Sequence, residues 1–358
     1  MYIDGHLDLA FNAVVHDRDL TQDVMTVRRT EDRTHQELLV TLPELKKGGI
    51  GIVFGTLFAM PQSVLSAAGD TLAPWKAALS YTTPDEAHAL AVEQLEQYEQ
   101  WEEAGHLRIL TTQETLSEHV AAWADGDRTP GMVILMEGAD PIRTPSELGW
   151  WVERGVRLIG PAWKRTRYAG GTDAPGPLTS EGHALLRAMI EHGIPLDVSH
   201  LSTESFWDAM DLGPEHVIAS HSNARAITPG DRHLSDAMIE AIADANGIIG
   251  LVLGNPFVHP NPDSTRVTLR HVRRHAEHMA DLVGWEHLAI GSDFDGGFGV
   301  QETPHGITRG SDFKKLGSIA PPHAREGLLG GNWLRFLRRI LPTQRISSVS
   351  NHSKTNIQ

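Results

Sequence analysis

The stretch YIDGHLD, residues 2–8, opens the chain with an apolar run that carries a histidine and an aspartate two positions apart. Side chains two apart on a β-strand point to the same face, so a strand here would present His6 and Asp8 together. Charged residues are rarely buried unless they have a partner, and both residue types bind metal ions. The stretch therefore predicts the first strand of a buried sheet, with a functional site at its C-terminal end.

Short apolar runs alternate with longer amphipathic runs along the rest of the chain, which is the pattern of a parallel α/β fold. Strands are predicted at Tyr2–Asp8, Gly51–Leu57, Met132–Glu137, Val156–Trp163, Ile194–His200, Val217–His221, Ile248–Leu253 and Leu288–Asp293. Helices are predicted at Pro84–Gly105, Leu178–His192, Thr203–Asp211, Asp236–Ala245, Arg266–Val283 and Arg325–Ile340. Eight strands separated by helices predict a (β/α)8 barrel of the TIM type. An open doubly wound sheet is the alternative, but its glycine-rich phosphate loop is missing after the first strand.

The length of 358 residues suits one barrel domain over residues 1–345, followed by a polar, frayed tail at 346–358. Two long connections, Ala59–Thr83 and Lys164–Thr179, are rich in Gly, Pro, Ser and Thr and are expected to lie over the barrel mouth. The net charge of −15 argues against a nucleic-acid partner, because phosphates would be repelled. Neither a signal-peptide pattern nor an apolar run of membrane-spanning length is visible, so we expect a cytoplasmic protein without a membrane partner.

Residues that bind metal ions recur where the predicted strands end, namely His6, Asp8, Glu137, His200, His221 and Asp293. In barrel enzymes this end of the strands carries the active site. Three carboxylates crowded in a mouth of low dielectric would repel one another, and divalent cations would remove that cost. The chain has no cysteine, and imidazole with carboxylate suits Zn²⁺, Mn²⁺ or Fe²⁺ better than Ca²⁺. Six groups exceed what one catalytic zinc takes, so two metals that share a carboxylate fit better.

Each of these residues also has a purely structural interpretation. A single histidine at a strand end is commonly a hydrogen-bonded core residue, and Asp293 and Asp295 in SDFDGG could form turns. The joint placement of six such groups at one rim favours the metal site. In HVRRHAEH, His271, His275 and His278 have helical spacing but lack the glutamate of the H-E-x-x-H motif, so a solvated helix face is expected there.

The motifs DGHLDL, MEG, DVSHLS, ASHSNARA and GSDFDG resemble, in order, the conserved blocks of the renal, or membrane, dipeptidases (peptidase family M19). These are dizinc peptidases of the amidohydrolase superfamily, and GGNWLRFL is similar to the closing helix of the family. The resemblance implies a (β/α)8 barrel with two zinc ions. It implies that His6 and Asp8 bind the first ion, that His200 and His221 bind the second, and that Glu137 bridges them. It also implies that Asp293 is the general acid/base and that Arg232, in GDRHLS, holds the carboxylate of the substrate.

One position departs from the renal pattern. The family places a histidine at the end of the fourth strand, where it helps to stabilise the tetrahedral intermediate, whereas GVRLIGPAW places Trp163 there. An indole N–H donates a hydrogen bond but cannot carry a proton, so substrate preference is expected to differ. The metal-bridging lysine used elsewhere in the superfamily is absent from this strand, and Lys164 is interpreted as a loop residue.

The sequence thus predicts hydrolysis of the amide bond of small dipeptides, including those with a D-residue at the C-terminal side, by a metal-bridging hydroxide. Glu137 and Asp293 are the predicted catalytic residues, and Arg232 and Trp163 are predicted to contact the substrate. The alternatives are a related metal-dependent amidase or deacylase of N-acyl amino acids, a lactonase, or a non-catalytic barrel. A homodimer is the expected assembly, since dimers are common among soluble enzymes.

Overall fold

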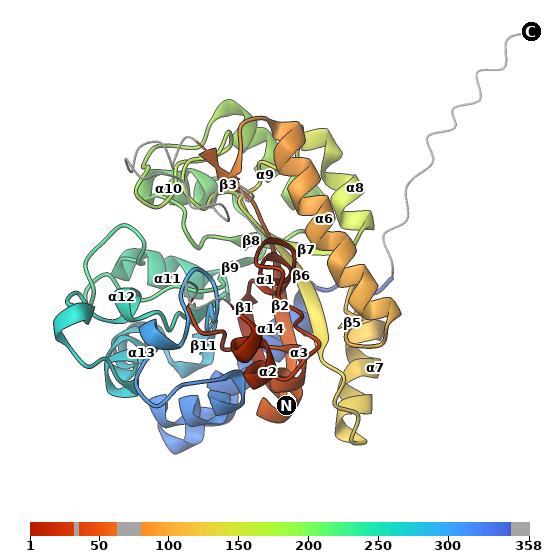
Figure 1. Ribbon diagram of the computed structural model, residues 1–358. Helices are drawn as coiled ribbons and strands as arrows, with labels where there is room; N and C mark the ends of the chain where they lie inside the picture. The colour runs from red at the N-terminus through yellow and green to blue at the C-terminus, as the bar shows by residue number, and fades with distance from the viewer. Residues whose placement is uncertain (32–35, 63–79, 345–358) are drawn as a thin grey trace, which may run out of the picture.

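Parallel strands occupy the middle of the molecule, and helices lie around them (Figure 1). This computed structural model describes residues 1–31, 36–62 and 80–344. Neighbouring strands pair in the order β1 (Tyr2–Leu7), β2 (Ile50–Phe58), β6 (Gly131–Glu137), β7 (Val156–Gly160), β8 (Leu196–Asp197), β9 (Val217–Ala219), β10 (Ile248–Leu251) and β11 (Leu288–Ile290). The backbone N–H of Asp293, just after β11, donates to the carbonyl of His6 at 3.2 Å and joins the last strand to the first. The predicted (β/α)8 barrel is therefore confirmed.

The helices and minor strands follow the barrel strands in alternation. The helices are α1 (Leu9–Val15), α2 (Val24–Thr30), α3 (Leu42–Gly48), α6 (Pro84–Glu103), α7 (Gln113–Ala124), α8 (Leu148–Glu153), α9 (Ser180–Glu191), α10 (Thr203–Asp211), α11 (Asp236–Asp244), α12 (Asn255–Val258), α13 (Leu269–Val283) and α14 (Asn332–Ile340). The minor strands are β3 (Met60–Pro61), β4 (Ser80–Tyr81) and β5 (Arg108–Ile109). Thr83 begins α6 with a capping box and Pro84 follows at its first position, so local sequence fixes where this helix begins. Helices α1 to α3 were not predicted, because seven residues offer too few turns for a periodic pattern.

Six of the eight predicted strands extend past the observed strands at the rim of the barrel, by one to three residues. The fourth ends at Gly160 rather than at Trp163, and the fifth ends at Asp197 rather than at His200. His200 and Asp293 adopt positive φ angles of 68° and 58°, which an extended strand cannot contain. Such conformations are costly for residues other than glycine and concentrate at functional sites. His200 and Asp293 are therefore presented by turns that follow the strands, whereas His6 and Glu137 lie within β1 and β6.

Helix α14 closes the opposite, N-terminal end of the barrel. Trp333 is fully buried there, with its ring centroid 4.8 Å from that of Phe54, and its indole N–H donates to the carbonyl of Ile290 at 2.8 Å. Gly5 of β1 faces this ring, and a Cβ atom at Gly5 would lie only 2.6 Å from it. The glycine of DGHLD is thus required by the close approach of the closing helix.

The three histidines of α13 do not gather into a site. His271 contacts the backbone N–H of Thr268 at 3.1 Å, and His278 lies 2.7 Å from a carboxylate oxygen of Asp236. His275 is fully buried, accepts from the N–H of Ala224 at 3.2 Å and lies 3.1 Å from the carbonyl of Val258. The prediction of a solvated face is wrong for His275, because it shares the buried face of the helix with Val272, Ala276 and Met279.

The two long connections differ in how much of them is described. Residues 63–79 of the first, and the predicted tail at 346–358, lie outside the described residues. The second reaches the barrel mouth, where the hydroxyl of Thr172 lies 3.0 Å from Nδ1 of His200.

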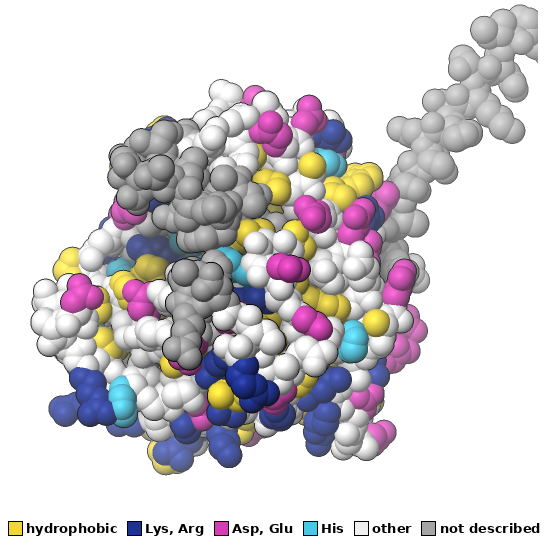
Figure 2. Space-filling model, in the orientation of Figure 1, with side chains coloured by type: hydrophobic (Ala, Val, Ile, Leu, Met, Phe, Trp, Pro, Cys, Tyr) yellow, Lys and Arg dark blue, Asp and Glu magenta, His cyan; other side chains and the backbone are white. Residues whose placement is uncertain are grey.

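On the face seen in Figure 2, Lys and Arg side chains gather along the lower edge, so the net negative charge is unevenly distributed. No helix within the described part of the chain is both long and apolar enough to cross a membrane.

Candidate active site

The carboxylate of Glu137, at the end of β6, lies among three imidazole rings at the barrel mouth. Its Oε2 is 3.5 Å from Nε2 of His6, and its Oε1 is 3.1 Å from Nε2 of His200 and 3.5 Å from Nε2 of His221. The Nε2 atoms of His200 and His221 are themselves 3.0 Å apart. All four side chains are buried. The two oxygens of Glu137 therefore face different histidines, as a carboxylate that bridges two ions would.

Asp8 and Asp293 complete the group on the side of His6. An oxygen of each carboxylate lies 3.9 Å from Nε2 of His6, and the hydroxyl of Thr56 contacts the carboxylate of Asp8. Nε2 of His6 is buried and has no hydrogen-bond partner among the residues that the structure describes. A buried polar atom without a partner is costly, and a metal ion at this position would satisfy it. The structure thus brings together all six residues that the sequence predicted at the rim.

Charge repulsion and burial shift the acid–base properties of the group. Burial alone would lower the pKa of His6, but the carboxylates of Glu137, Asp8 and Asp293 more than offset this effect and raise it to about 10. Burial, reinforced by the charge of Glu137, raises the pKa of Asp8 to about 6, and burial raises the pKa of Asp293 well above its usual range. Glu137 keeps a pKa below its usual range, because the charges of His6 and His200 outweigh its burial. Without metal, the group holds protons to relieve the crowding of three carboxylates.

The pKa values of His200 and His221 are lowered, in contrast to the raised pKa of His6. Burial and the charge of Arg232 lower the pKa of His200 to about 4, and burial with the charge of His6 lowers the pKa of His221 well below its usual range. Both rings are therefore neutral near pH 7, which is the form that binds metal ions. The ligand atoms form two sets, each within 4.8 Å: Glu137 with His200 and His221, and His6 with Asp8 and Asp293.

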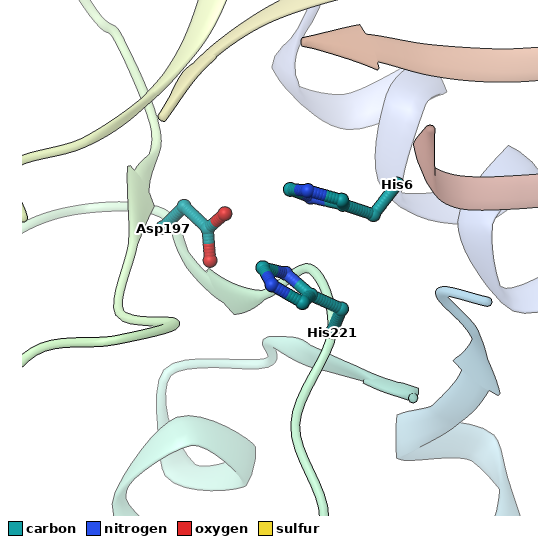
Figure 3. A group of neighbouring side chains, drawn as sticks. All are labelled: His6, Asp197 and His221. Carbon is teal, nitrogen blue, oxygen red and sulfur yellow. The ribbon is translucent and has the colours of Figure 1, made fainter. Parts of the chain in front are cut away.

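Asp197, at the end of β8, is a buried carboxylate that the sequence interpretation missed. Figure 3 shows the rings of His6 and His221 one above the other, with the side chain of Asp197 pointing toward them; the ring centroids are 3.6 Å apart. Asp197 forms a third set with these histidines within 4.8 Å. Its Oδ1 accepts the backbone N–H groups of Ser199 at 3.0 Å and Ser220 at 2.9 Å. A carboxylate inside the apolar run IPLDV was the signal that could have indicated it.

Two further buried aspartates support the site without joining it. Asp4 accepts the backbone N–H of Ser292 at 2.7 Å and its hydroxyl at 2.5 Å, which fixes the residue before Asp293 against β1. Asp295 accepts the backbone N–H groups of Leu39 and Val40, each at 2.8 Å, and so holds a neighbouring loop. Its φ of 65° agrees with the turn-forming interpretation of this residue.

The two residues predicted to contact the substrate border this cluster of imidazoles and carboxylates. Arg232 is buried, and its guanidinium donates to Ser222 Oγ at 3.1 Å and to the carbonyl of His221 at 2.8 Å. Its Nε has no hydrogen-bond partner in the described part of the chain. The ring of Trp163 lies in the loop after β7, 6.2 Å from the ring of His200 and 5.2 Å from that of Phe58, measured between centroids.

Lys164 lies outside the cluster, as its loop interpretation requires. Its Nζ is 5.6 Å from the centroid of the Trp163 ring and 3.6 Å from a carboxylate oxygen of Asp173, so it is paired within its own loop. The bridging position between the imidazoles is taken by the carboxylate of Glu137 instead.

Comparisons with known proteins show which family the chain belongs to. Residues 1–350 match the family model described as membrane dipeptidase (peptidase family M19). The chain is similar to an uncharacterised protein in the pqqA 5′ region of Klebsiella pneumoniae, with 31% identity over 233 residues that make up 60% of this chain and 83% of that protein.

Two solved structures are similar along nearly the whole chain. One is the dipeptidase AC, a metallopeptidase of family M19, with a TM-score of 0.77, 25% identity, and 95% of this chain and 98% of that chain covered. The other is a metallopeptidase from Rhodobacter sphaeroides bound to a phosphinate mimic of L-Ala-D-Ala, with a TM-score of 0.77, 24% identity, and 95% and 99% covered. The chain therefore belongs to the membrane dipeptidase family, peptidase family M19.

Proposed function

We propose that the chain hydrolyses dipeptides at a centre of two divalent metal ions, and that both ions are Zn²⁺. The observation that carries this proposal is the placement of Glu137, whose two carboxylate oxygens face His6 on one side and His200 and His221 on the other. His6 and Asp8 would hold one ion, His200 and His221 the other, and Glu137 would bridge them. The sets of imidazole and carboxylate ligands, with no cysteine in the chain, fit zinc.

When bound, such ions lower the pKa of a water molecule toward neutrality and polarise the carbonyl group of the substrate. The protein then has to move a proton from the attacking water to the leaving amine. Asp293 is placed for this task, because its carboxylate lies 3.9 Å from Nε2 of His6 and its pKa is raised by burial. A carboxyl group with a raised pKa holds a proton more readily than a free carboxyl group, which suits a general acid/base.

Arg232 would hold the free C-terminal carboxylate of the substrate. Its guanidinium is fixed by Ser222 and by the carbonyl of His221, and its buried Nε, which has no hydrogen-bond partner among the described residues, is the donor proposed for the carboxylate. A charged hydrogen bond of this kind is stronger than a neutral one. Arg232 would thus bind a free C-terminal carboxylate close to the amide bond that is cleaved. A dipeptide offers both groups together, whereas most amide bonds of a protein are far from its C-terminus. Dipeptides with a D-residue at the C-terminal side are included in the proposal, since the similar Rhodobacter structure holds a mimic of L-Ala-D-Ala.

Trp163 supports a second candidate function, the deacylation of N-acyl amino acids. Its indole lies beside His200 and contacts Phe58, which belongs to a small apolar cluster with Phe11 and Met60. An N-acyl amino acid offers the same carboxylate to Arg232 and an apolar acyl group in place of the amino-terminal residue. The substitution of Trp for the family histidine would favour such a group, because it replaces a polar ring with a larger apolar one.

A substrate panel on protein loaded with Zn²⁺ tests both candidates. L,L and L,D dipeptides are compared with N-acyl amino acids, and each is also offered with its C-terminal carboxylate converted to an amide. We expect the dipeptides to give the highest kcat/KM, and Arg232→Ala to raise KM about 10- to 100-fold for the acids. The amides serve as the control, because they lack the group that Arg232 would bind. The absence of dipeptide hydrolysis would overturn the proposed function.

The homodimer and the cytoplasmic location belong to this proposal as predictions from the sequence. Light scattering on the purified chain and cell fractionation would test them separately.

A further inference from the structure

Each imidazole of the centre has a hydroxyl group at its Nδ1 atom, on the side of the ring away from Nε2. Nδ1 of His200 lies 3.0 Å from the hydroxyl of Thr172. Nδ1 of His6 and Nδ1 of His221 instead share one partner, the hydroxyl of Ser220, at 3.1 Å and 2.8 Å. Neither of these hydroxyl residues stands out in the sequence. One hydroxyl therefore contacts a histidine from each of the two proposed metal positions.

A metal ion bound at Nε2 would determine where each imidazole ring carries its proton. A neutral imidazole bound to metal through Nε2 carries its proton on Nδ1, so His6 and His221 would both donate. A serine hydroxyl can accept two hydrogen bonds and donate one. Ser220 can thus accept from both rings and donate its own proton to Ser199 Oγ, which is 3.3 Å away.

The surroundings of Ser220 hold its hydroxyl in place. Ser220 is fully buried, and its backbone N–H donates to Asp197, which also accepts the N–H of Ser199. The two rings lie 3.6 Å apart between centroids, and they come from different strands, His6 from β1 and His221 from the residues just after β9. A hydroxyl held in this way fixes both the tautomer and the orientation of each ring.

We propose that Ser220 is a positioning residue shared by the two metal positions, orienting His6 for one ion and His221 for the other. This inference rests on the proposed function, which assigns the two histidines to different ions. The proposed role is specific to Ser220, because the hydroxyl of Thr172 contacts a histidine of only one of the two proposed metal positions.

Metal titration of three serine and threonine variants tests the inference. Metal-free protein is titrated with Zn²⁺ in competition with a chromophoric chelator, which measures the affinity of each ion without using activity. We expect Ser220→Ala to weaken the affinity for both ions about 10- to 100-fold, and Thr172→Val to weaken the affinity for one ion. Ser222→Ala is the matched control: its hydroxyl contacts Arg232 rather than an imidazole, so both affinities should remain.

A measurement on the unsubstituted chain makes the test independent of how well the variants fold. In ¹⁵N-histidine NMR of the Zn²⁺-loaded protein, we expect His6 and His221 each to carry a proton on Nδ1. Metal bound through Nδ1 of either ring would overturn the role of Ser220, as would a Ser220→Ala variant that retains one affinity unchanged. Uptake of fewer than two ions by the unsubstituted chain is a different failure, because it overturns the two-metal proposal itself and the shared role with it.

Discussion

The two ends of the barrel are built from the same strands but contain opposite kinds of residues. At the N-terminal end, Trp333 of α14 packs on Phe54 in an apolar cluster with Ile3 and Leu135. At the C-terminal end, a few residues further along β1 and β6, the buried side chains are His6, Asp8 and Glu137. Burial of apolar area stabilises the fold, whereas burial of charged groups costs free energy unless they are paired. The residues that stabilise the fold and those that form the candidate site therefore lie at opposite ends of the same strands.

This difference explains why the mouth suits a divalent metal ion and the closed end does not. The apolar end is complete in itself, with the indole N–H of Trp333 satisfied by the carbonyl of Ile290. The mouth leaves Nε2 of His6 without a partner among the described residues and raises the pKa values of Asp8 and Asp293. If the two ends are independent, each can be altered without loss of the other.

The largest effect is expected at the mouth, from Glu137→Gln. The amide keeps the shape of the side chain but removes the charge that faces all three histidines. We expect kcat/KM for dipeptides to fall by more than about 10³-fold, with metal content reduced. Metal analysis and steady-state kinetics measure these changes. Unfolding of the metal-free variant in urea should resemble that of the unsubstituted chain, and a collapse of the fold would contradict the separation of the two ends.

The next effect is expected at the closed end, from Trp333→Ala. Removal of this fully buried ring should lower the free energy of unfolding by about 3–5 kcal/mol. The folded fraction should still bind metal and keep kcat/KM within a few-fold, because the ring packs against Phe54 and Gly5 rather than against the six residues of the mouth. Denaturant unfolding and metal analysis check both parts. Trp207→Ala is the control, since Trp207 is 38% exposed and its removal should change stability little.

The smallest effect concerns the proton that His6 holds in the metal-free protein. Its pKa of about 10 means that an ion bound at Nε2 must displace a proton throughout the neutral range. The apparent affinity for that ion should rise about tenfold for each unit of pH between 6.5 and 8.5, and fall as the pH falls. His200, with a pKa of about 4, is already neutral and adds no such dependence. Zn²⁺ titrations across this range measure the slope, and an affinity independent of pH would show that His6 is not protonated.

Much of the architecture could be predicted because its signals are local. Alternating apolar and amphipathic runs predict the barrel, and Thr83 with Pro84 predicts the beginning of a helix. The polar residues at the rim were recognisable because they interrupt or end apolar strands. His275 shows the limit of such patterns: its charged neighbours suggested an exposed face, yet the helix turns it into the core beside Val272.

The sequence by itself determined the strand order, the polar residues placed near the strand ends and the family, since these depend on periodicity and on motifs within a few residues. Only the tertiary structure decided which groups meet. Ser220 and His6 are separated by 214 positions in sequence and become partners because barrel closure brings β9 opposite β1. Gly5 likewise has no local reason to be glycine until α14 inserts Trp333 against it. Contacts of this kind arise from how the strands close on themselves, and no local pattern carries that information.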